Sequence, residues 1–465
     1  MKNFFHLFLI TILFLIPTAL FAQTNANSGI SSGPAYQPFL KDLAESVSAD
    51  RLEQDIRILA GFDNRHTMSD TTSDTHGIGA ARRWIREEFE KISADCGGCL
   101  DVYYVSGMVG GENRIPDPVN IVNVVAVQRG STDPTRVVMM TGDIDSRASD
   151  VMDAISDSPG ANDNASGMAG TIEAARVLSK HEFSGTIVYA GLSGEEQGLF
   201  GGQILADYAI EHGWRIKAVL NNDMIGNIEG INGIVNNTTA RVFSEGTRAV
   251  ETEREARIRR FTGGEVDSPS RNLARYIHTM GHHYIDNLDV MMIYRLDRFG
   301  RGGHHRPFND VGFPAVRIME TNEHYDRQHQ DIRVENGIEY GDVIEGVDFD
   351  YATKLTALNV VTLAGMAKAP NPPVNVGING AVQPSTTLSW DALDTKQNPH
   401  LEGYKVYWRL TTSPVWTDAR PAGNGTEFTL ENIVIDNYYF GVASVSEDGY
   451  ESPVVFPGPN GSFGE

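Results

Sequence analysis

The sequence predicts an α/β domain with a largely parallel sheet sandwiched by helices, followed by a small all-β sandwich. Between about Tyr36 and Ala369, segments with helical spacing alternate with short β-branched runs, and polar clusters follow several of these runs. After Ala369 the pattern changes to alternating runs separated by turn residues, which predicts the sandwich. A chain of 465 residues has room for two or three such domains.

The composition is that of a globular protein with an acidic surface. Hydrophobic residues make up 41% and charged residues 21% of the chain, and the formal net charge is −23. Because phosphate groups would be repelled by this charge, we expect neither nucleic acids nor anionic membranes as partners.

The first 22 residues have the pattern of an export signal. Lys2 is followed by the apolar run Leu7–Ile16, then by Pro17 and a small residue, Ala22, after which we expect cleavage. The alternative is a retained membrane anchor, but the run is short and Pro17 interrupts it. With no later apolar segment of spanning length, we expect a mature chain without a membrane span, secreted or periplasmic.

The sequence contains two cysteines, Cys96 and Cys99, in the string CGGC. In the cytosol this spacing would suggest redox chemistry or metal binding, but two cysteines cannot complete a structural zinc site. Because an exported protein meets oxidising conditions, we expect a local structural disulfide between them.

Periodicity locates the main elements of the first domain, residues 23–369, which opens with a flexible leader. We expect helices at 80–92 and 167–178, and strands at 121–127, 136–140, 186–190 and 218–221. A proline-rich linker then leads into the second domain, residues 370–460, with strands expected at 386–390, 403–409, 427–430 and 438–445.

Polar clusters follow the predicted strands of the first domain, and in α/β folds such positions meet at the carboxyl edge of the sheet. Carboxylates gathered there would repel one another, and a divalent cation removes that penalty. Mixed carboxylate and imidazole ligands suit zinc. Any one of these acids alone would more simply cap a helix or face solvent; together they predict a metal site. The clusters are TGDIDS (141–146), PGANDNASG (159–167), GLSGEEQG (191–198), NNDMIG (221–226) and QHQD (328–331).

The strings GANDNASG (160–167) and SGEEQGLFG (193–201) resemble those of family-28 metallopeptidases. That family includes bacterial leucyl aminopeptidases, aminopeptidase Y and glutamate carboxypeptidases. The resemblance covers the whole first domain in order and spacing. It implies a globular fold with a mixed, mostly parallel central sheet and two co-catalytic zinc ions.

The resemblance also implies roles for individual residues. Asp163 is similar to the carboxylate that bridges both metals, and the peptide bond after it is often cis in the family. Glu195 is similar to the general base that takes a proton from the attacking water. Glu196 and Asp223 are similar to ligands of the two metals, and His329 to the late histidine ligand.

One position departs from the family pattern. Where the family has a His-x-Asp pair, this chain has Asp143 and Asp145. The second acid normally orients the histidine, so Asp145 loses its usual partner; Asp331 lies close to the histidine ligand in sequence and is a further supporting residue. Three outcomes are open: Asp143 binds a metal directly, or the first metal binds weakly and leaves a one-zinc site, or the site is inactive.

The pair His304 and His305 precedes a Pro-Phe sequence near the implied substrate pocket. His305 is similar to a family histidine that could stabilise the oxyanion, although packing or loop hydrogen bonding is the simpler role. The arginine-rich run Tyr294–Arg301 could hold a substrate carboxylate or pair with surface acids.

The leading function is therefore that of an aminopeptidase, which binds one or two zinc ions and acts on peptides. The alternatives are a carboxypeptidase, a one-zinc enzyme resembling glutaminyl cyclases, and an inactivated peptidase-like binding protein. The second domain resembles fibronectin type III domains around Trp390, Gly403–Trp408 and Tyr438–Val445. It carries no catalytic residues, and we expect it to space, stabilise or contact a surface or polymer.

Overall fold

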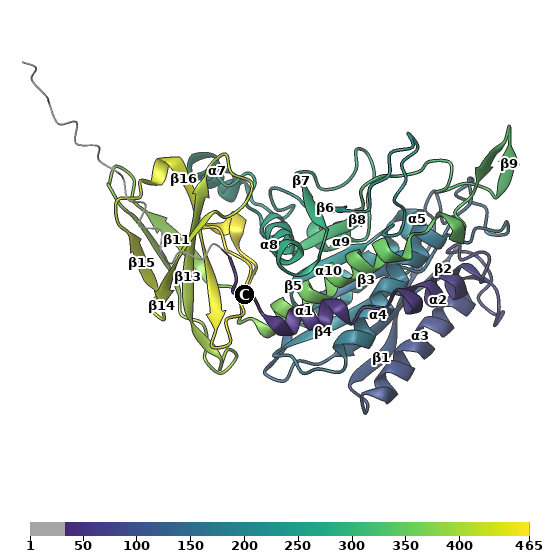
Figure 1. The fold of residues 1–465 in the computed structure, drawn as a ribbon, viewed down its shortest axis with the longest axis horizontal. Coiled ribbons are helices and arrows are strands. Elements are labelled where there is room, and N and C mark those ends of the chain that lie inside the picture. The colour runs from purple at the N-terminus through teal and green to yellow at the C-terminus, as the bar shows by residue number, and fades with distance from the viewer. Residues whose placement is uncertain (1–32, 465) are drawn as a thin grey trace, which may run out of the picture. The chain divides into compact units, whose positions relative to one another are not determined.

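A mixed sheet of eight strands is the central feature of the computed structural model, which describes residues 33–464. The strand order is β1-β2-β4-β3-β5-β8-β6-β7 (Figure 1). The predicted signal, residues 1–22, lies outside the described residues. The strands are β1 (Leu100–Val109), β2 (Val119–Gln128), β3 (Asp133–Asp143), β4 (Gly185–Leu192), β5 (Arg215–Asn222), β6 (Thr239–Phe243), β7 (Asp289–Ile293) and β8 (Ala315–Glu320).

The centre of this sheet is parallel and its flanks are mixed. Strands β4, β3, β5 and β8 pair in parallel, so their carboxyl ends lie at one edge. On one side β2 pairs antiparallel with β4 and with β1; on the other, β6 pairs antiparallel with β8 and parallel with β7. The sheet is therefore mixed around a parallel core, and this core decides where the strand-end residues meet.

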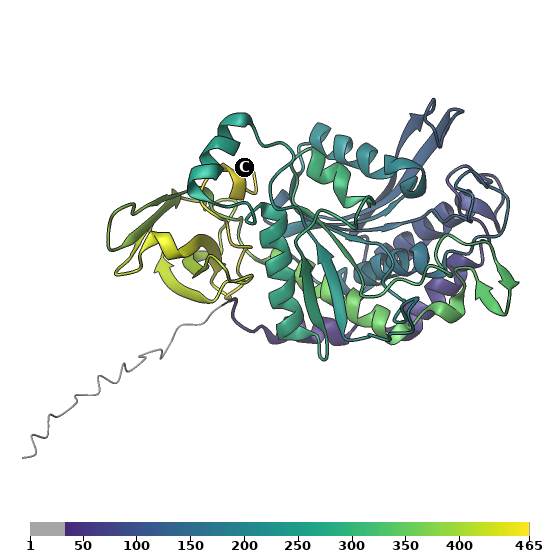
Figure 2. The same cartoon turned by 90° about the horizontal axis from the view of Figure 1, so that it is seen from above.

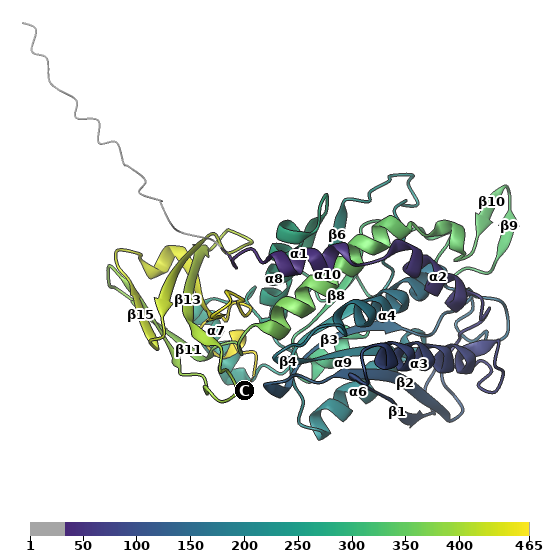
Figure 3. The same ribbon diagram turned by 60° about the horizontal axis from the view of Figure 1, so that its bottom comes forward.

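Helices cover both faces of the sheet (Figures 2 and 3). The larger layer packs into the same hydrophobic cluster as one set of strand side chains, and the smaller layer packs on the opposite face. The first layer comprises α1 (Pro38–Glu45), α2 (Ala49–Ala60), α3 (Gly77–Asp95), α4 (Gly167–Leu178), α8 (Pro269–Tyr284) and α10 (Phe349–Lys368). The second comprises α6 (Phe200–Glu211) and α9 (His305–Asp310).

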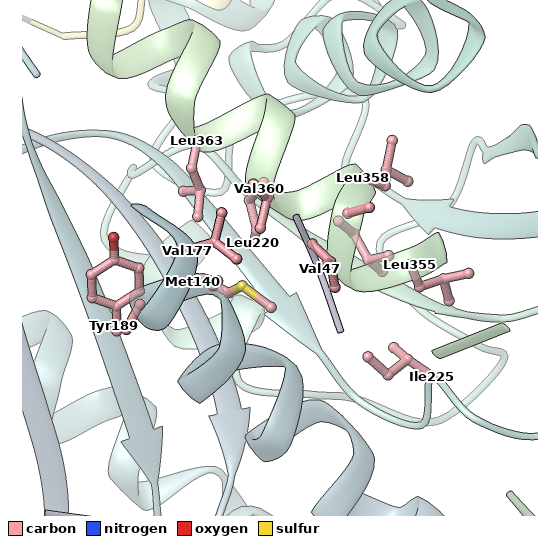
Figure 4. Close-up of a cluster of buried hydrophobic side chains, with 14 of the residues drawn as sticks. Val47, Met140, Val177, Tyr189, Leu220, Ile225, Leu355, Leu358, Val360 and Leu363 are labelled. Carbon is pink, nitrogen blue, oxygen red and sulfur yellow. The ribbon is translucent and has the colours of Figure 1, made fainter. Parts of the chain in front are cut away.

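Alternate strand residues supply these two cores. In β3, Val138 and Met140 face the α4 and α10 side, whereas Val137 and Met139 face the α6 side. Figure 4 shows Met140 beside α10 residues such as Leu363. Because side chains alternate along a strand, a sheet covered on both faces needs continuous apolar runs. This explains why the run RVVMM reads as uniformly hydrophobic.

The helices begin and end where local sequence signals favour it. The Ser48 hydroxyl accepts the N–H of Arg51 at the start of α2, and the Asp348 carboxylate accepts the N–H of Tyr351 at the start of α10. The predicted helix at 167–178 has the bounds of α4, and the predicted 80–92 lies inside α3. Cys96 and Cys99 form a disulfide just after α3.

After α10, two three-stranded sheets, β11-β12-β15 and β14-β13-β16, pack around a core that includes Trp390, Tyr404 and Phe440. A two-stranded hairpin, β9 with β10, precedes α10. Within residues 33–464, no helix has the length and apolar character needed to cross a membrane. The remaining bounds are α5 (Glu195–Gly198), α7 (Glu253–Thr262), β9 (Arg333–Glu335), β10 (Ile338–Tyr340), β11 (Val374–Asn379), β12 (Thr386–Asp391), β13 (Leu401–Leu410), β14 (Asp418–Gly423), β15 (Glu427–Leu430) and β16 (Tyr438–Ser446).

Buried ion pairs join the C-terminal sheets to the helical layer. Asp267, just before α8, is fully buried and accepts hydrogen bonds from Arg275 of α8 at 2.8 Å and from Arg409 of β13 at 2.8 Å. The described residues, 33–464, accordingly belong to one compact unit.

Candidate metal centre

The carboxyl edge of the parallel strands brings the predicted acids together, and four of them line one cavity. Asp143 is the last residue of β3, Glu195 follows β4 as the first residue of α5, and Asp223 directly follows β5. Asp163 reaches the same edge from the turn Ala161–Ser166, where the backbone at Asp163 and Asn164 is not helical. The cavity has a volume of about 550 Å³, and Asp163, Glu195, Glu196, Asp223 and His329 line it.

Three of these residues form a compact ligand set. His329 Nε2 lies 3.0 Å from Asp163 Oδ2 and 2.9 Å from Glu196 Oε1. One ligand atom of each residue lies within 4.8 Å of the other two. Two carboxylates and one imidazole, open to a cavity on the fourth side, fit a catalytic zinc ion. The Asp163–Asn164 peptide bond is cis, as the family resemblance implies.

The charges of the two carboxylates favour a cation between them, as the pKa shifts of His329 and Asp163 indicate. Burial opposes charge on the imidazole, but the carboxylates of Glu196 and Asp163 outweigh it and raise the pKa of His329 to about 10. Burial also opposes the Asp163 charge, yet the hydrogen bond and charge of His329 hold the pKa of Asp163 below its ordinary value. Without a metal, a proton on His329 therefore supplies the positive charge.

A buried carboxylate holds the turn that carries Asp163. Asp342 accepts the backbone N–H of Asn162 at 2.9 Å and that of Asp163 at 2.6 Å. The Asn164 side chain donates to the Asn222 carbonyl at 2.7 Å and accepts from the N–H of Met224 at 3.2 Å. The turn is thus tied to β5 from one side and to Asp342 from the other. Sequence reasoning missed Asp342, which lies in a loop more than 170 residues away.

Asp145 supports the turn that carries Glu195 and Glu196. Its carboxylate accepts the backbone N–H of Glu195 at 3.3 Å and of Glu196 at 3.1 Å, together with the Thr67 hydroxyl at 3.1 Å. Asp145 therefore positions the two glutamates in place of the histidine partner that the sequence lacks. Gly194, with a φ of 77°, makes the sharp entry into this turn.

Glu195 faces the cavity beside the triad. Burial, together with the neighbouring charges of Glu196, Asp223 and Asp143, raises the pKa of Glu195 well above its ordinary value. A carboxylate whose proton affinity is raised in this way suits a group that accepts and then returns a proton.

Asp143 and Asp223 have partners other than the triad. Asp143 Oδ1 lies 2.6 Å from His304 Nδ1, and Asp143 Oδ2 accepts from Asn164 at 2.8 Å. Burial raises the pKa of Asp143 to about 8 and lowers the pKa of His304 to about 4. Asp223 Oδ2 lies 2.5 Å from Arg317 Nη2.

Two expected residues lie away from the reacting centre. His305 is fully buried, bonds to the Leu296 carbonyl at 2.9 Å and is not among the residues that line the cavity. Its contacts are those of loop hydrogen bonding and give no support to an oxyanion role. Asp331 is exposed and accepts the N–H of Ser149 at 3.0 Å, so it braces the loop after His329 without touching a ligand.

Arg317 is a second residue near the site, after Asp342, that sequence reasoning missed. It lies in β8 within the apolar run AVRIME and is fully buried. A charged residue inside a strand that is covered on both faces must have a buried partner. An arginine within an apolar run could therefore have indicated a buried ion pair, but the sequence does not identify its partner.

Arginines also gather around the mouth of the cavity. Arg298 and Arg301 both lie against Glu323, at 2.9 and 3.2 Å, and both line the cavity. Arg306 lines the cavity too and has no ion pair within the part of the chain that the structure describes. The run that includes Arg298 thus pairs with an acid and faces the pocket, and its contact with a substrate carboxylate stays a prediction.

The fold and the triad together define a zinc metallopeptidase. A family model described as Peptidase family M28 matches residues 123–337. A probable zinc metalloprotease of Leptosphaeria maculans is 42% identical over 427 residues, covering 92% of this chain and 98% of its own. One of Pyrenophora tritici-repentis is 41% identical, covering 90% of this chain and 87% of its own. The chain belongs to peptidase family M28 and is a zinc-dependent metallopeptidase.

Solved structures agree at the level of the fold. The aminopeptidase LapA of Legionella pneumophila superposes with a TM-score of 0.53 at 20% identity, covering 73% of this chain and 78% of that one. LapB of the same organism gives a TM-score of 0.50 at 19% identity, covering 72% and 76%. These likenesses support the mixed α/β architecture.

Proposed function

We propose that this protein is an exopeptidase that releases single residues from the amino end of peptides. The observation that carries the proposal is the convergence of Asp163, Glu196 and His329 on a cavity that Glu195 also lines. At about 550 Å³ the cavity suits a terminal residue and its neighbour rather than a long peptide segment. The fold likeness to the LapA aminopeptidase supports the choice of the amino end.

Each residue of the site has its own role in the hydrolysis of an amide bond. A zinc ion held by Asp163, Glu196 and His329 would polarise the scissile carbonyl and lower the pKa of a nearby water. Glu195 accepts the proton of the attacking water and returns it to the leaving amine. Asp145 bonds to the backbone N–H groups of Glu195 and Glu196 and so fixes the position of the base relative to the ligand.

The test is Glu195→Gln assayed on aminoacyl p-nitroanilides, with zinc content measured in parallel. Removing the base should lower kcat by about 10² to 10⁴-fold while zinc content stays at the wild-type level. Glu90→Gln, at an exposed helix position, is the matched control and should be fully active. Near-full activity of Glu195→Gln would refute the assignment.

A second candidate, cleavage at the carboxyl end or beside acidic residues, is favoured by the arginines at the cavity mouth. Arg241, Arg298 and Arg301 all pair with Glu323, Arg298 pairs with Asp297 as well, and Arg306 has no ion pair among residues 33–464. The guanidinium group of Arg306 is therefore available to a substrate carboxylate at the cavity mouth.

Two substrates separate the candidates. An N-acylated dipeptide with a free carboxylate is open only to a carboxypeptidase, and an aminoacyl amide only to an aminopeptidase. Turnover of the amide alone would support the first proposal. Turnover of the blocked dipeptide, together with a raised KM for Arg306→Met, would support the second.

Export to the periplasm or medium is part of the proposal. The N-terminal sequence pattern supports it, as does the Cys96–Cys99 disulfide, since disulfides persist in oxidising compartments. We also propose that the C-terminal sheets form a fibronectin type III-like domain that contacts surfaces or polymers. The core around Trp390 and Tyr404 supports this domain type. Mass spectrometry of the mature N-terminus would test the cleavage after Ala22.

A further inference from the structure

A guanidinium group stands beside the acid that the resemblance makes a ligand of the second metal. Arg317 Nη2 lies 2.5 Å from Asp223 Oδ2, and its Nη1 lies 3.2 Å from Asp297 Oδ2 and donates to the Gly302 carbonyl at 2.6 Å. Arg317 and Asp297 are almost fully buried. The side chain is therefore anchored at its far end, and its charge is held against Asp223.

The other acid of the implied second site is also engaged. Asp143 uses one carboxylate oxygen with His304 and the other with Asn164. Among residues 33–464, the only set of three ligand groups close enough to hold one ion is Asp163, Glu196 and His329. Asp143 and Asp223 thus belong to no second set. Both oxygens of Asp143 have partners, and Oδ2 of Asp223 faces Arg317, while its Oδ1 has no hydrogen-bond partner among the described residues.

The two halves of the site differ in what a metal would have to displace. At the triad the carboxylates of Asp163 and Glu196 face an imidazole nitrogen, which can itself bind an incoming zinc ion. At Asp223 the counter-cation is an arginine, which does not lose its proton in proteins and is covalently part of the core. A dication placed next to this guanidinium would be repelled in a buried setting where charges are poorly screened.

We propose that Arg317 takes the place of the second metal ion, so that the centre holds one zinc ion at Asp163, Glu196 and His329. The inference rests on the proposed zinc site and goes beyond it by fixing the number of ions. Asp163, which the resemblance makes a bridge between two metals, then binds a single ion. Asp223 serves as the partner of Arg317 rather than as a ligand.

Metal content of the full chain is the first test. The wild type is saturated with zinc, freed of excess by gel filtration and analysed by mass spectrometry of the elements, together with His329→Ala. We expect one zinc per wild-type chain and none in the variant. Two ions per wild-type chain would overturn the inference and leave the proposed function intact. No zinc in the wild type would overturn both.

Asp223→Asn separates the two roles of Asp223. If Asp223 is only the partner of Arg317, the variant keeps one zinc per chain, because the triad is untouched and Asp297 still holds Arg317. If Asp223 is a metal ligand, zinc content or affinity falls, and the inference is wrong. Circular dichroism confirms that the variant is folded, and cobalt titration gives a second readout: the visible absorbance should stop rising at one equivalent in both proteins.

A gain-of-site variant tests Arg317 directly. Asp143→His combined with Arg317→Met restores the histidine of the family pattern and removes the built-in cation. We expect the folded double variant to bind a second zinc ion, whereas Asp143→His alone should still bind one. A folded double variant that binds a single ion would refute Arg317 as the group that excludes the second metal.

Discussion

The carboxylate of Asp145 accepts the backbone N–H of Glu196 at 3.1 Å, so an acid that never reaches the cavity sets the direction of a metal ligand. The same carboxylate accepts the N–H of Glu195. One buried group therefore holds both the base and the ligand. In the family pattern this acid orients a histidine. Here Asp143 stands in place of the histidine, and Asp145 instead positions Glu195 and Glu196 through their backbone N–H groups.

Asp145→Asn should lower both activity and zinc affinity. The amide keeps one acceptor oxygen but turns an NH₂ group toward the second backbone donor, which misplaces the turn. Loss of such an outer partner typically costs about 10 to 100-fold in metal affinity or activity. Steady-state kinetics measure the loss of activity, and zinc competition with a chromophoric chelator measures the loss of zinc affinity. Glu87→Gln, at an exposed position of α3, is the control; an equal loss in both variants would contradict the role of Asp145.

Zinc binding should release a proton from His329. Because the pKa of His329 in the metal-free site is about 10, the imidazole is charged at neutral pH and must be neutral to bind zinc. Apparent zinc affinity should therefore rise about tenfold per pH unit from about pH 6 to about pH 9. Calorimetry in buffers of different ionisation enthalpy counts the proton. An affinity that does not change with pH would show that His329 is neutral before the metal arrives.

Glu245 should make the folded protein less stable as pH rises. Burial, and to a lesser extent the charge of Asp310, raises the pKa of Glu245 from 4.5 to about 8. The folded state therefore holds a proton that the unfolded state has lost between these values, and stability falls as pH increases through this window. The effect is limited to a few kcal/mol, at about 1.4 kcal/mol per pKa unit.

The measurement for Glu245 is urea unfolding of the wild type and Glu245→Gln at several pH values. The difference in unfolding free energy should shift in favour of the variant from about pH 4.5 to about pH 8 and then level off. Glu427→Gln, on an exposed edge of β15, should follow the wild type throughout. A constant difference for Glu245→Gln would show that Glu245 ionises normally.

Breaking the Asp267 ion pairs should destabilise the chain strongly. Asp267→Asn leaves Arg275 and Arg409 without their buried counter-charge, which typically costs about 3 to 5 kcal/mol. Thermal unfolding monitored by circular dichroism would detect it. Removing the exposed Arg86–Glu90 pair should cost less than about 1 kcal/mol. Similar losses at the two sites would mean that Asp267 is accessible to water.

Much of the fold follows from local pattern. Runs such as RVVMM and TIVYA predict buried strands because a sheet covered on both faces needs apolar residues at every position. The predicted helix at 167–178 matches α4. Patterns of this kind do not reveal the antiparallel flanks, since β2 and β6 have the same composition as the parallel strands, and their direction depends on the connections around them.

The sequence by itself indicated a set of candidate ligands. Glu195 and Glu196 follow β4 and Asp223 follows β5, and parallel strands must bring their carboxyl ends to one edge. Asp163 and His329 lie away from the strand ends, and the family resemblance indicated them. Only the tertiary structure decided which acids remain free to bind an ion. Arg317 and Asp223 are 94 residues apart, and His304 and Asp143 are 161 apart. Which buried charges neutralise one another depends on how distant segments pack, because desolvation obliges each charge to find a partner that no local pattern names.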